Sequence, residues 1–231
     1  MIFKKDKPTF EHASIVQNDF PTVKQASATV PDWYKKTPKF LSGKFSEVDD
    51  RTFKACTPFL EAITTGYHLL LPADIMVSIK NGKQAFFWRN RDQLVDQRNP
   101  QSNPFLPVPH GYSNEHWVWK TFGSFTVPKD YSILFTHPLN RNDLPFYTLS
   151  GVLEGGYVLA PHGSIPFFLK ENFEGVIHQG TPIAQLIPFK NEKWELKENN
   201  KILEEGFKNT EKANTVFLGW YKNTHWKKKQ W

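Results

Sequence analysis

The middle of the chain alternates short apolar runs with turn residues. Such runs recur from Trp117 to Phe189, and Tyr131–Phe135 and Ile183–Phe189 are two of them. Short runs that are rich in aromatic and β-branched side chains and end at Gly, Pro or Asn are typical of β-strands. Many such strands at near-regular spacing favour a β-sandwich or a β-barrel. We therefore expect a mainly β chain.

The dipeptide Asn81-Gly82 lies between two of these runs, Val77–Ile79 and Gln84–Trp88. A two-residue turn of type I′ needs positive φ at both central positions, and Asn followed by Gly adopts this conformation readily. The pattern predicts a β-hairpin with its turn at residues 81–82.

The N-terminal part of the chain lacks this strand pattern. Prolines interrupt residues 1–50, and each proline disfavours helix at the residue before it. Residues 49–63 suit a short helix, because an Asp at the start can cap free backbone N–H groups. Aromatic side chains favour an arm that lies across the core or across a neighbouring subunit; they are Phe3, Phe10, Phe20, Trp33, Tyr34, Phe40 and Phe45.

The C-terminal part is expected to hold one more strand, over residues 191–196, and then a helix from Lys201 to Tyr221. The apolar face of this helix would consist of Ile202, Leu203, Phe207, Val216, Phe217 and Trp220, at roughly helical spacing. The chain thus divides into an N-terminal aromatic arm with a short helix (1–66), a β-core (67–196), and a C-terminal helix with a basic aromatic tail (197–231).

Composition excludes several classes of protein. Hydrophobic residues make up 39% of the 231 positions and aromatic residues 15%, which excludes wholesale disorder. No apolar run approaches the length of a membrane-spanning helix. The single cysteine, Cys56, excludes an internal disulfide and a cysteine-rich zinc site. No apolar stretch follows the charged start of the chain, so we expect no signal peptide and no secretion.

Positive charge gathers near the C-terminus. Lys and Arg number 29 against 23 Asp and Glu, a net charge of +6, and lysines alternate with aromatic residues from Trp220 to Trp231. Basic groups beside stackable rings suit contact with a nucleic acid or an acidic protein. The other interpretation is a solvated tail whose tryptophans pack back on the body, and the lack of any nucleic-acid-binding motif favours it.

Polar residues follow the apolar run Tyr131–Phe135 and form the candidate ligand site. His137, Asn140 and Arg141 come directly after this run, where pockets often open. Asn140 and Arg141 would converge with Glu154 on a polar ligand, and Tyr157 would stack on it. The simpler interpretation is a turn at Pro138 and Asn140. Gln185, inside an apolar run, can satisfy backbone groups.

Histidines offer a second, weaker candidate. His110 and His116 flank Glu115, and His162 or His178 would complete a metal site of the kind found in cupin barrels. Hydrogen-bonded structural histidines are the preferred interpretation, because no His-x-His or His-x-Asp pair occurs. We assign no residue a catalytic or metal-binding role and expect no cofactor.

Three motifs between residues 127 and 189 occur together in one known family. They are Val127-Pro-Lys-Asp-Tyr131, Gly151-Val-Leu-Glu-Gly-Gly-Tyr157 and Gly180-Thr-Pro-Ile-Ala-Gln-Leu186. Their order and approximate spacing resemble the core of the dUTPase and dCTP deaminase family. The resemblance implies a β-clip (dUTPase-like) sandwich or barrel, in which the middle motif contacts a sugar and Glu154 stands where that family has an aspartate.

The chain departs from that family at two places. The family has an Arg-Ser-Ser element that binds phosphate, whereas this chain has Thr136-His-Pro-Leu-Asn-Arg-Asn142. The family also closes its site with a glycine-rich C-terminal arm, whereas the end of this chain, from Phe207 onward, has Gly219 alone and no such motif. The whole chain additionally resembles proteins that tailed phages encode.

The first functional hypothesis is a non-enzymatic structural or interaction protein of viral type on a dUTPase-like scaffold. The resemblance, together with the aromatic arms, implies a homo-oligomer, most simply a trimer. We expect it in the host cytoplasm or the virion. The alternative is a nucleotide-binding diphosphatase with a rearranged phosphate site that uses Mg²⁺. There Glu154 would orient a water, Tyr157 would carry the sugar and Arg141 the phosphate. A metal-dependent cupin-like enzyme is the second alternative.

Overall fold

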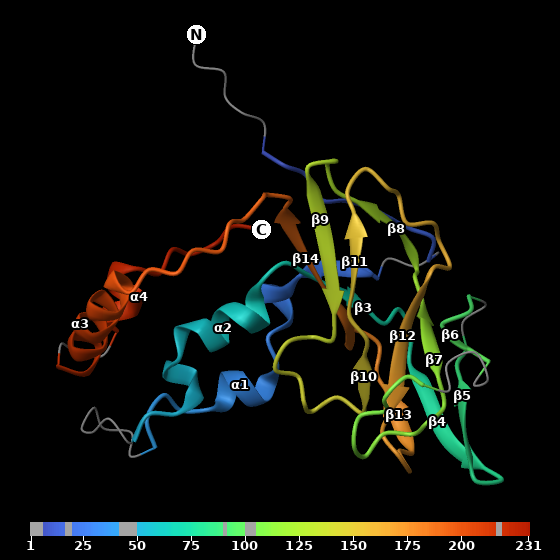
Figure 1. Cartoon of the computed structure of the whole chain (residues 1–231). Helices are drawn as coiled ribbons and strands as arrows, with labels where there is room; N and C mark the ends of the chain where they lie inside the picture. Colours follow the sequence, from blue (N-terminus) through green and yellow to red (C-terminus); the bar gives the residue numbers. More distant parts are fainter. Residues whose placement is uncertain (1–6, 17–19, 42–49, 90–91, 100–104, 216–218) are drawn as a thin grey trace. The chain divides into compact units, whose positions relative to one another are not determined.

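The computed structural model describes residues 7–16, 20–41, 50–89, 92–99, 105–215 and 219–231 (Figure 1). It divides into two compact units. The first, here called the sheet unit, comprises Met1–Val30 and Ile63–Asn191. The second, here called the helix unit, comprises Pro31–Ala62 and Glu192–Trp231. Phe3, Phe45, Val216 and Phe217, which entered the expectations above, lie outside the described residues.

Short strands make up the sheet unit, and all pairings between them are antiparallel. Their orders within the described sheets are β1-β8, β10-β12-β7-β6, β11-β9-β14-β3-β2 and β13-β4-β5. The prediction of a mainly β chain is confirmed. The strand bounds are β1 Glu11–Ser14, β2 Val23–Gln25, β3 Tyr67–Leu70, β4 Ile75–Lys80, β5 Lys83–Phe87, β6 Val95–Gln97, β7 Trp117–Lys120, β8 Gly123–Thr126, β9 Tyr131–Thr136, β10 Phe146–Thr148, β11 Gly151–Glu154, β12 Ser164–Leu169, β13 Gly175–Ile177 and β14 Pro182–Lys190.

The predicted helices are present with changed bounds. The described helices are η1 Ala26–Thr29, α1 Asp32–Lys36, η3 Phe53–Ala55, α2 Thr57–Thr64, α3 Lys201–Thr215 and α4 Trp220–Thr224. The C-terminal helix is confirmed as far as Thr215, and α4 starts after Gly219, whose φ is 109°. The strand expected over residues 191–196 is wrong, because residues 191–199 form no regular element and their side chains are exposed.

The N-terminal arm contributes two strands that the sequence pattern does not predict. β1 pairs with β8 and β2 pairs with β3, so both strands extend sheets whose other strands come from the core. The Phe10 ring stacks on Tyr67 at 4.5 Å between ring centroids, and it also stacks on Phe125. The expectation that this arm lies across the core is therefore confirmed for its described residues before Pro31, whereas residues 31–62 belong to the helix unit.

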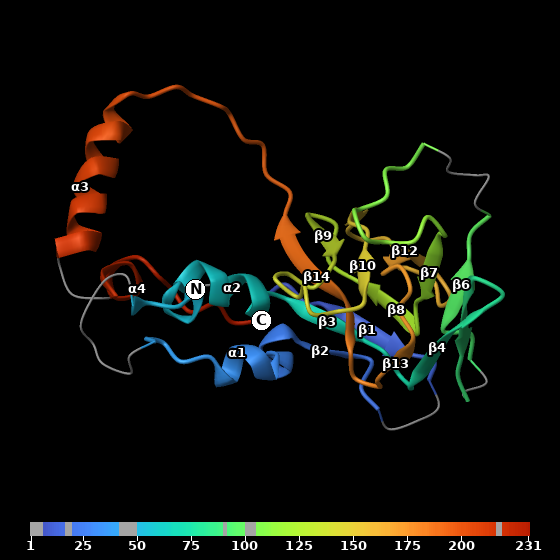
Figure 2. The same ribbon diagram turned by 90° about the horizontal axis from the view of Figure 1, so that it is seen from below.

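β14 is the central strand of the largest sheet, between β9 and β3 (Figure 2). Its first five residues, Pro182 to Leu186, are all buried. Gly66, just before β3, has a φ of +70° and lies so close to β14 that a Cβ there would meet the carbonyl oxygen of Leu186. The close approach and the positive φ together account for glycine at this position.

Aromatic rings fill the core between the sheets. The Trp119 and Phe167 rings stack at 3.8 Å between centroids, and Phe146 meets Trp119 edge-on at 5.0 Å. All three side chains are at most 1% exposed. Replacing one such ring by alanine typically costs about 3–5 kcal/mol, so this cluster is a main source of the stability of the sheet unit.

The hairpin prediction is confirmed in detail. β4 and β5 pair in register up to Lys80 and Lys83, and the turn residues Asn81 and Gly82 have φ values of 51° and 74°. Both positive angles are those of a type I′ turn, as the Asn-Gly dipeptide predicts.

Rings also organise the helix unit. Tyr34 of α1 stacks on Phe59 of α2 at 6.0 Å, and Phe53 lies 5.1 Å from Phe59. Nζ of Lys229 in the C-terminal tail lies 3.1 Å from a carboxylate oxygen of Glu61. The basic tail therefore makes at least one contact with α2 inside its own unit.

None of the described helices is both long enough and apolar enough to cross a membrane.

Replacing Gly66 by alanine should strongly destabilise the chain. We expect a loss of roughly 3 kcal/mol in the free energy of unfolding, because the strained φ and the clash with β14 add together. Gly82→Ala is the matched control: its φ is +74°, but a Cβ there meets nothing within 4 Å. This control should lose only about 1–2 kcal/mol. Urea unfolding measures both values, and equal losses would contradict the close approach.

Candidate functional site

The six candidate ligand residues form two groups at opposite ends of β9. His137, Asn140 and Arg141 follow the last residue of the strand, and Gln185 is paired with Thr136. Glu154, in contrast, is paired with Ser132 near the start of β9. Five residues of strand separate the two ends, roughly 16 Å at the usual rise.

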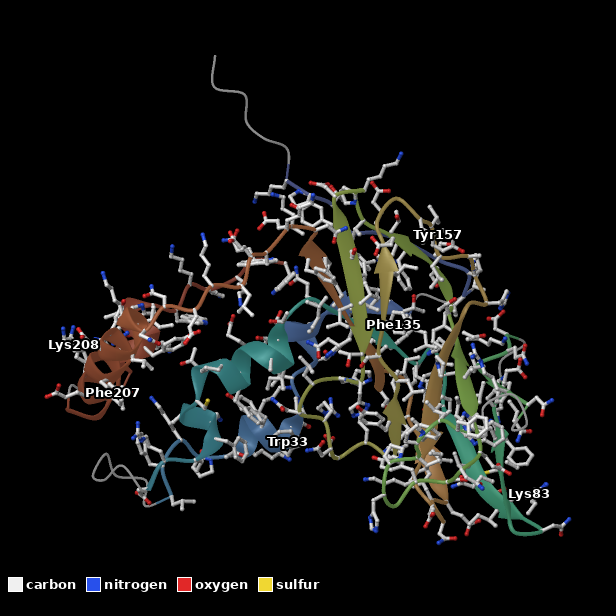
Figure 3. All side chains as sticks on the ribbon, viewed as in Figure 1. Trp33, Lys83, Phe135, Tyr157, Phe207 and Lys208 are labelled. Atoms are coloured by element: carbon white, nitrogen blue, oxygen red, sulfur yellow. The ribbon has the colours of Figure 1, made fainter. Side chains whose placement is uncertain are left out.

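Tyr157 belongs to the second group. Figure 3 shows it away from Phe135, which precedes the first group by two residues. The expected convergence of Asn140 and Arg141 with Glu154 and Tyr157 is therefore wrong. The register of β9 with β11 and β14 sets this distance, and spacing along the sequence does not reveal it.

His137 uses both ring nitrogens inside the protein. The backbone N–H of Thr148 donates to Nδ1 at 3.3 Å, so Nδ1 carries no proton. Nε2 lies 3.1 Å from the carbonyl oxygen of Arg141 and must be the donor there. Burial lowers the pKa of His137 below its ordinary value, although the bond to the Arg141 carbonyl partly opposes the shift. The ring is a neutral structural group.

The segment after His137 is a turn, as the simpler interpretation predicts. The Arg141 N–H donates to the Pro138 carbonyl at 3.1 Å, and Asn140 has a φ of 60° in the third turn position. Asn tolerates this left-handed conformation better than most residues. The Arg141 guanidinium donates from Nε and Nη to the two carboxylate oxygens of Asp143, at 2.8 and 2.9 Å. This forked contact engages the cation that a phosphate would need.

Gln185 joins two loops from inside the sheet. Its Oε1 accepts from the Leu139 N–H at 2.8 Å, and its Nε2 donates to the Thr65 carbonyl at 2.7 Å. The side chain is completely buried. The expectation that Gln185 satisfies backbone groups is confirmed, and the amide fixes the loop after β9 to the segment before β3.

His68 lies beside Gln185 and was not among the sequence candidates. The two residues are cross-strand partners in β3 and β14. Nδ1 of His68 lies 2.5 Å from the hydroxyl of Thr29, which itself donates to the Ala26 carbonyl, so Nδ1 is the donor. Burial lowers the pKa of His68 to about 4, although a hydrogen bond with Gln185 partly opposes the shift; the charge of Arg141 contributes a smaller decrease to the same value. The sequence does hold a sign of this buried residue, because His68 is the polar side chain inside the apolar run Tyr67–Leu71.

Glu154 is held by its own sheet. Its Oε2 accepts from the Ser132 hydroxyl at 3.1 Å, and the Ser132 hydroxyl also lies 2.8 Å from Oδ1 of Asn191. Nδ2 of Asn191 reaches the same Glu154 oxygen at 3.5 Å. This triad fixes the end of β14 against β9 and β11, which is a structural use of the carboxylate.

A cavity of about 500 Å³ opens beside Tyr131, at the start of β9, which is the end where Glu154 lies. Its wall includes the turn from Val127 to Tyr131 and the residues on either side of Tyr157, which is itself 56% exposed. The lining carries the cations Lys7, Lys129 and Lys190 and the anions Glu11 and Asp130. The cavity therefore coincides with the first motif of the dUTPase resemblance, whereas the His137 group lies elsewhere.

The histidines proposed for a metal do not gather. His116 is buried and packs edge-on against Phe168 at 5.1 Å, whereas His110 lines a second cavity of about 710 Å³ with Glu115. His162 occupies a turn with a φ of 65°, and His178 is 76% exposed at 3.6 Å from Asp74. No group of three His, Cys, Asp or Glu side chains suited to a metal occurs in the described part of the chain.

No family model and no curated protein matches the chain. Among solved structures, it is similar to a mutant dUTPase from phage phi11 of S. aureus, in which a structural Mg(II) ion is coordinated. The identity is 18%, the match covers 47% of this chain and 97% of that chain, and the TM-score is 0.26. The likeness is thus local, and the mainly β character follows from the strand pairing described above.

The buried histidines predict a loss of stability at acidic pH. Between pH 6.5 and about 4 the unfolded chain binds a proton at position 68 that the folded chain does not. Stability should therefore fall as the pH drops through this window, by roughly 3 kcal/mol for this residue. His137 contributes in the same direction.

Urea unfolding of wild type and His68→Asn at pH 7 and pH 4.5 tests this expectation. The variant should show a clearly smaller difference between the two pH values, because Asn cannot take up the proton. The exposed His178→Asn is the control and should retain the wild-type difference. An identical pH dependence in wild type and His68→Asn would contradict the assignment.

Proposed function

We propose that this chain is a non-enzymatic interaction protein on a β-sheet scaffold, and that it acts as a homo-oligomer, most simply a trimer. One observation carries the proposal: the polar side chains that would serve a ligand are engaged within the protein. His137, Arg141, Glu154 and Gln185 each form internal hydrogen bonds.

Catalysis would need polar groups that reach a substrate. A general base needs a lone pair within hydrogen-bond distance of the proton that it removes. Both nitrogens of His137 are used, and the Glu154 carboxylate is held by Ser132 and Asn191. Phosphoryl transfer additionally needs positive donors around the phosphates, and Arg141 is forked onto Asp143.

Large apolar side chains, in contrast, face solvent. On α3, Ile202, Leu203 and Phe207 are 61%, 58% and 74% exposed, and Trp194 and Leu196 in the preceding segment are 88% and 100% exposed. Contiguous exposed apolar surface marks sites where proteins associate. The sequence resemblance to tailed-phage proteins favours a role in a virion or its assembly, in the host cytoplasm or the particle.

Sedimentation of the purified chain tests the proposal. We expect a species of about three times the 26.9 kDa chain mass, and no hydrolysis of any nucleoside triphosphate with Mg²⁺. Turnover that Glu154→Gln abolishes would contradict the non-enzymatic proposal. A chain that stays monomeric at high micromolar concentration would contradict the oligomer.

A nucleotide-binding, dUTPase-like diphosphatase is the second candidate function. The observation that favours it is the 500 Å³ cavity, which brings Lys129 and Lys190 to the Val127–Tyr131 turn. Amines there suit phosphate groups, and Asp130 and Glu11 are the oxygen ligands that the same lining offers to Mg²⁺. No described cluster favours the cupin-like alternative in the same way.

Thermal unfolding with a panel of nucleoside triphosphates and Mg²⁺ separates the two functions. Binding to the folded chain would raise the melting temperature, and Lys129→Ala should then remove the shift. Lys83→Ala, at the tip of the β4–β5 hairpin, is the control that should retain it (Figure 3). The interaction-protein proposal expects no shift in wild type with any nucleotide.

A further inference from the structure

The outer face of the three-stranded sheet β13-β4-β5 carries a row of exposed apolar side chains. Val176 pairs with Met76, and Met76 pairs with Phe87, so the three side chains lie side by side across the sheet. They are 43%, 51% and 37% exposed. With neighbouring strands roughly 5 Å apart, the row is about as wide as one helix. We call it the sheet row.

Basic side chains border the sheet row at the hairpin end. Lys80 and Lys83 are cross-strand partners on the same face of the sheet, because they lie four residues from Met76 and Phe87 in the same alternation. Nζ of Lys80 sits 4.5 Å from the centre of the Phe87 ring. Ser78 and Ala85, the pair between, are small. A helix laid on this row would meet apolar surface and then positive charge.

The helix α3 has the complementary pattern. Ile202, Leu203 and Phe207 share one side of it, here called the helix stripe, and all are exposed. Glu204, Glu205 and Glu211 lie roughly 100–140° from the centre of the stripe, at 3.6 residues per turn. Lys201, Lys208 and Lys212 lie on the opposite side, roughly 160–180° away. Figure 3 shows Phe207 and Lys208 projecting from different sides of α3.

The borders of the two surfaces are therefore opposite in charge at the hairpin end; Glu174, the anion beside the sheet row, accepts from the Ile79 N–H at 2.8 Å within the sheet. The helix stripe has acidic side chains nearest to it, and the sheet row has Lys80 and Lys83 next to it. Such complementarity favours one orientation of docking and disfavours like-charged partners. When the helix stripe meets the sheet row, the apolar side chains of both surfaces are removed from water, which favours association.

The path of the chain favours docking between copies. The sheet row lies near the start of β14, where the Gly180 N–H donates to the Leu71 carbonyl at 2.8 Å. From Pro182 to Lys190, β14 then runs away from the row for eight residues, roughly 26 Å. Figure 1 shows β13 and β4 at the far end of the sheet unit from the tip of β14. The ten residues 191–200 reach at most about 35 Å, so roughly three quarters of their full extension would be spent on returning α3 to the row of its own copy.

We propose that α3 of one copy docks its helix stripe on the sheet row of a second copy, a deepening that rests on the proposed homo-oligomeric function. Each copy offers one helix and one sheet face, so the contact is head-to-tail. Repetition of such a contact closes into a ring when the rotation between copies fits, and three copies make the trimer.

Two variants of the full chain separate the halves of this contact. Phe207→Asp removes the helix stripe and Met76→Asp removes the sheet row, and both side chains are exposed, so neither change disturbs the core. Each variant alone should sediment as a 26.9 kDa monomer, with self-association weakened at least tenfold. An equimolar mixture should form a dimer, because one intact helix and one intact sheet row remain.

The controls and contrary results are distinct. Val152→Asp changes a side chain that is 56% exposed on β11 and should leave the oligomer intact. Circular dichroism and thermal unfolding verify that each variant folds. Charge exchange gives a further readout, since Lys80→Glu with Lys83→Glu should weaken association and Glu204→Lys with Glu205→Lys should partly restore it.

An oligomer that survives both Phe207→Asp and Met76→Asp overturns this docking and leaves the oligomeric function standing. Monomeric variants whose mixture forms no dimer also overturn it. A wild-type chain that is itself monomeric overturns both proposals.

Discussion

The hydrogen bonds of the Gln185 amide inside the central strand β14 are the constraint on which the sheet unit depends. Its two ends reach the Leu139 N–H and the Thr65 carbonyl, which belong to loops on either side of the strand. A buried amide that lost one partner would leave an unsatisfied polar group, at a cost of about 1–3 kcal/mol. Gln185 thus couples the positions of β9, β14 and β3. Gly66, whose backbone lies against Leu186, is part of the same contact between β14 and the segment before β3.

Other polar side chains near β9 are likewise engaged in hydrogen bonds within the sheet unit. His68, His137 and Thr148 continue the pattern, since each bonds to a backbone group or a neighbouring side chain within the sheet unit. The Thr148 hydroxyl donates to the Ile183 carbonyl in β14 and accepts from the Trp119 indole. Bonds of this kind specify which strands pair, and a substrate would have to break those of His137 and Thr148 to reach these two side chains.

Sequence reasoning succeeded where one local rule decides the outcome. Asn81-Gly82 requires a tight turn, and a glutamine in an apolar run requires backbone partners, so both predictions are confirmed. The predictions failed where strand pairing depends on residues that are distant in sequence. β1 is a short polar strand, and it forms because it pairs with the distant strand β8. The candidate site failed for the same reason, since strand register places Glu154 and Arg141 at opposite ends of β9.

The stability of α3 also depends on both local helix propensity and contacts with distant groups. A helix of 15 residues is marginal in water by itself, because nucleation is costly and most helical stability comes from packing. Gly206 lowers it further, by about 0.5–1 kcal/mol relative to alanine. A Cβ at this position would meet nothing within 4 Å, so no contact among the described residues explains the glycine. Gly206 lies on the same side as Ile202 and Leu203, where a missing side chain lets a second backbone approach. The order of α3 and its docking are therefore expected to be coupled, so that the contact between copies supplies the stability that the isolated helix lacks.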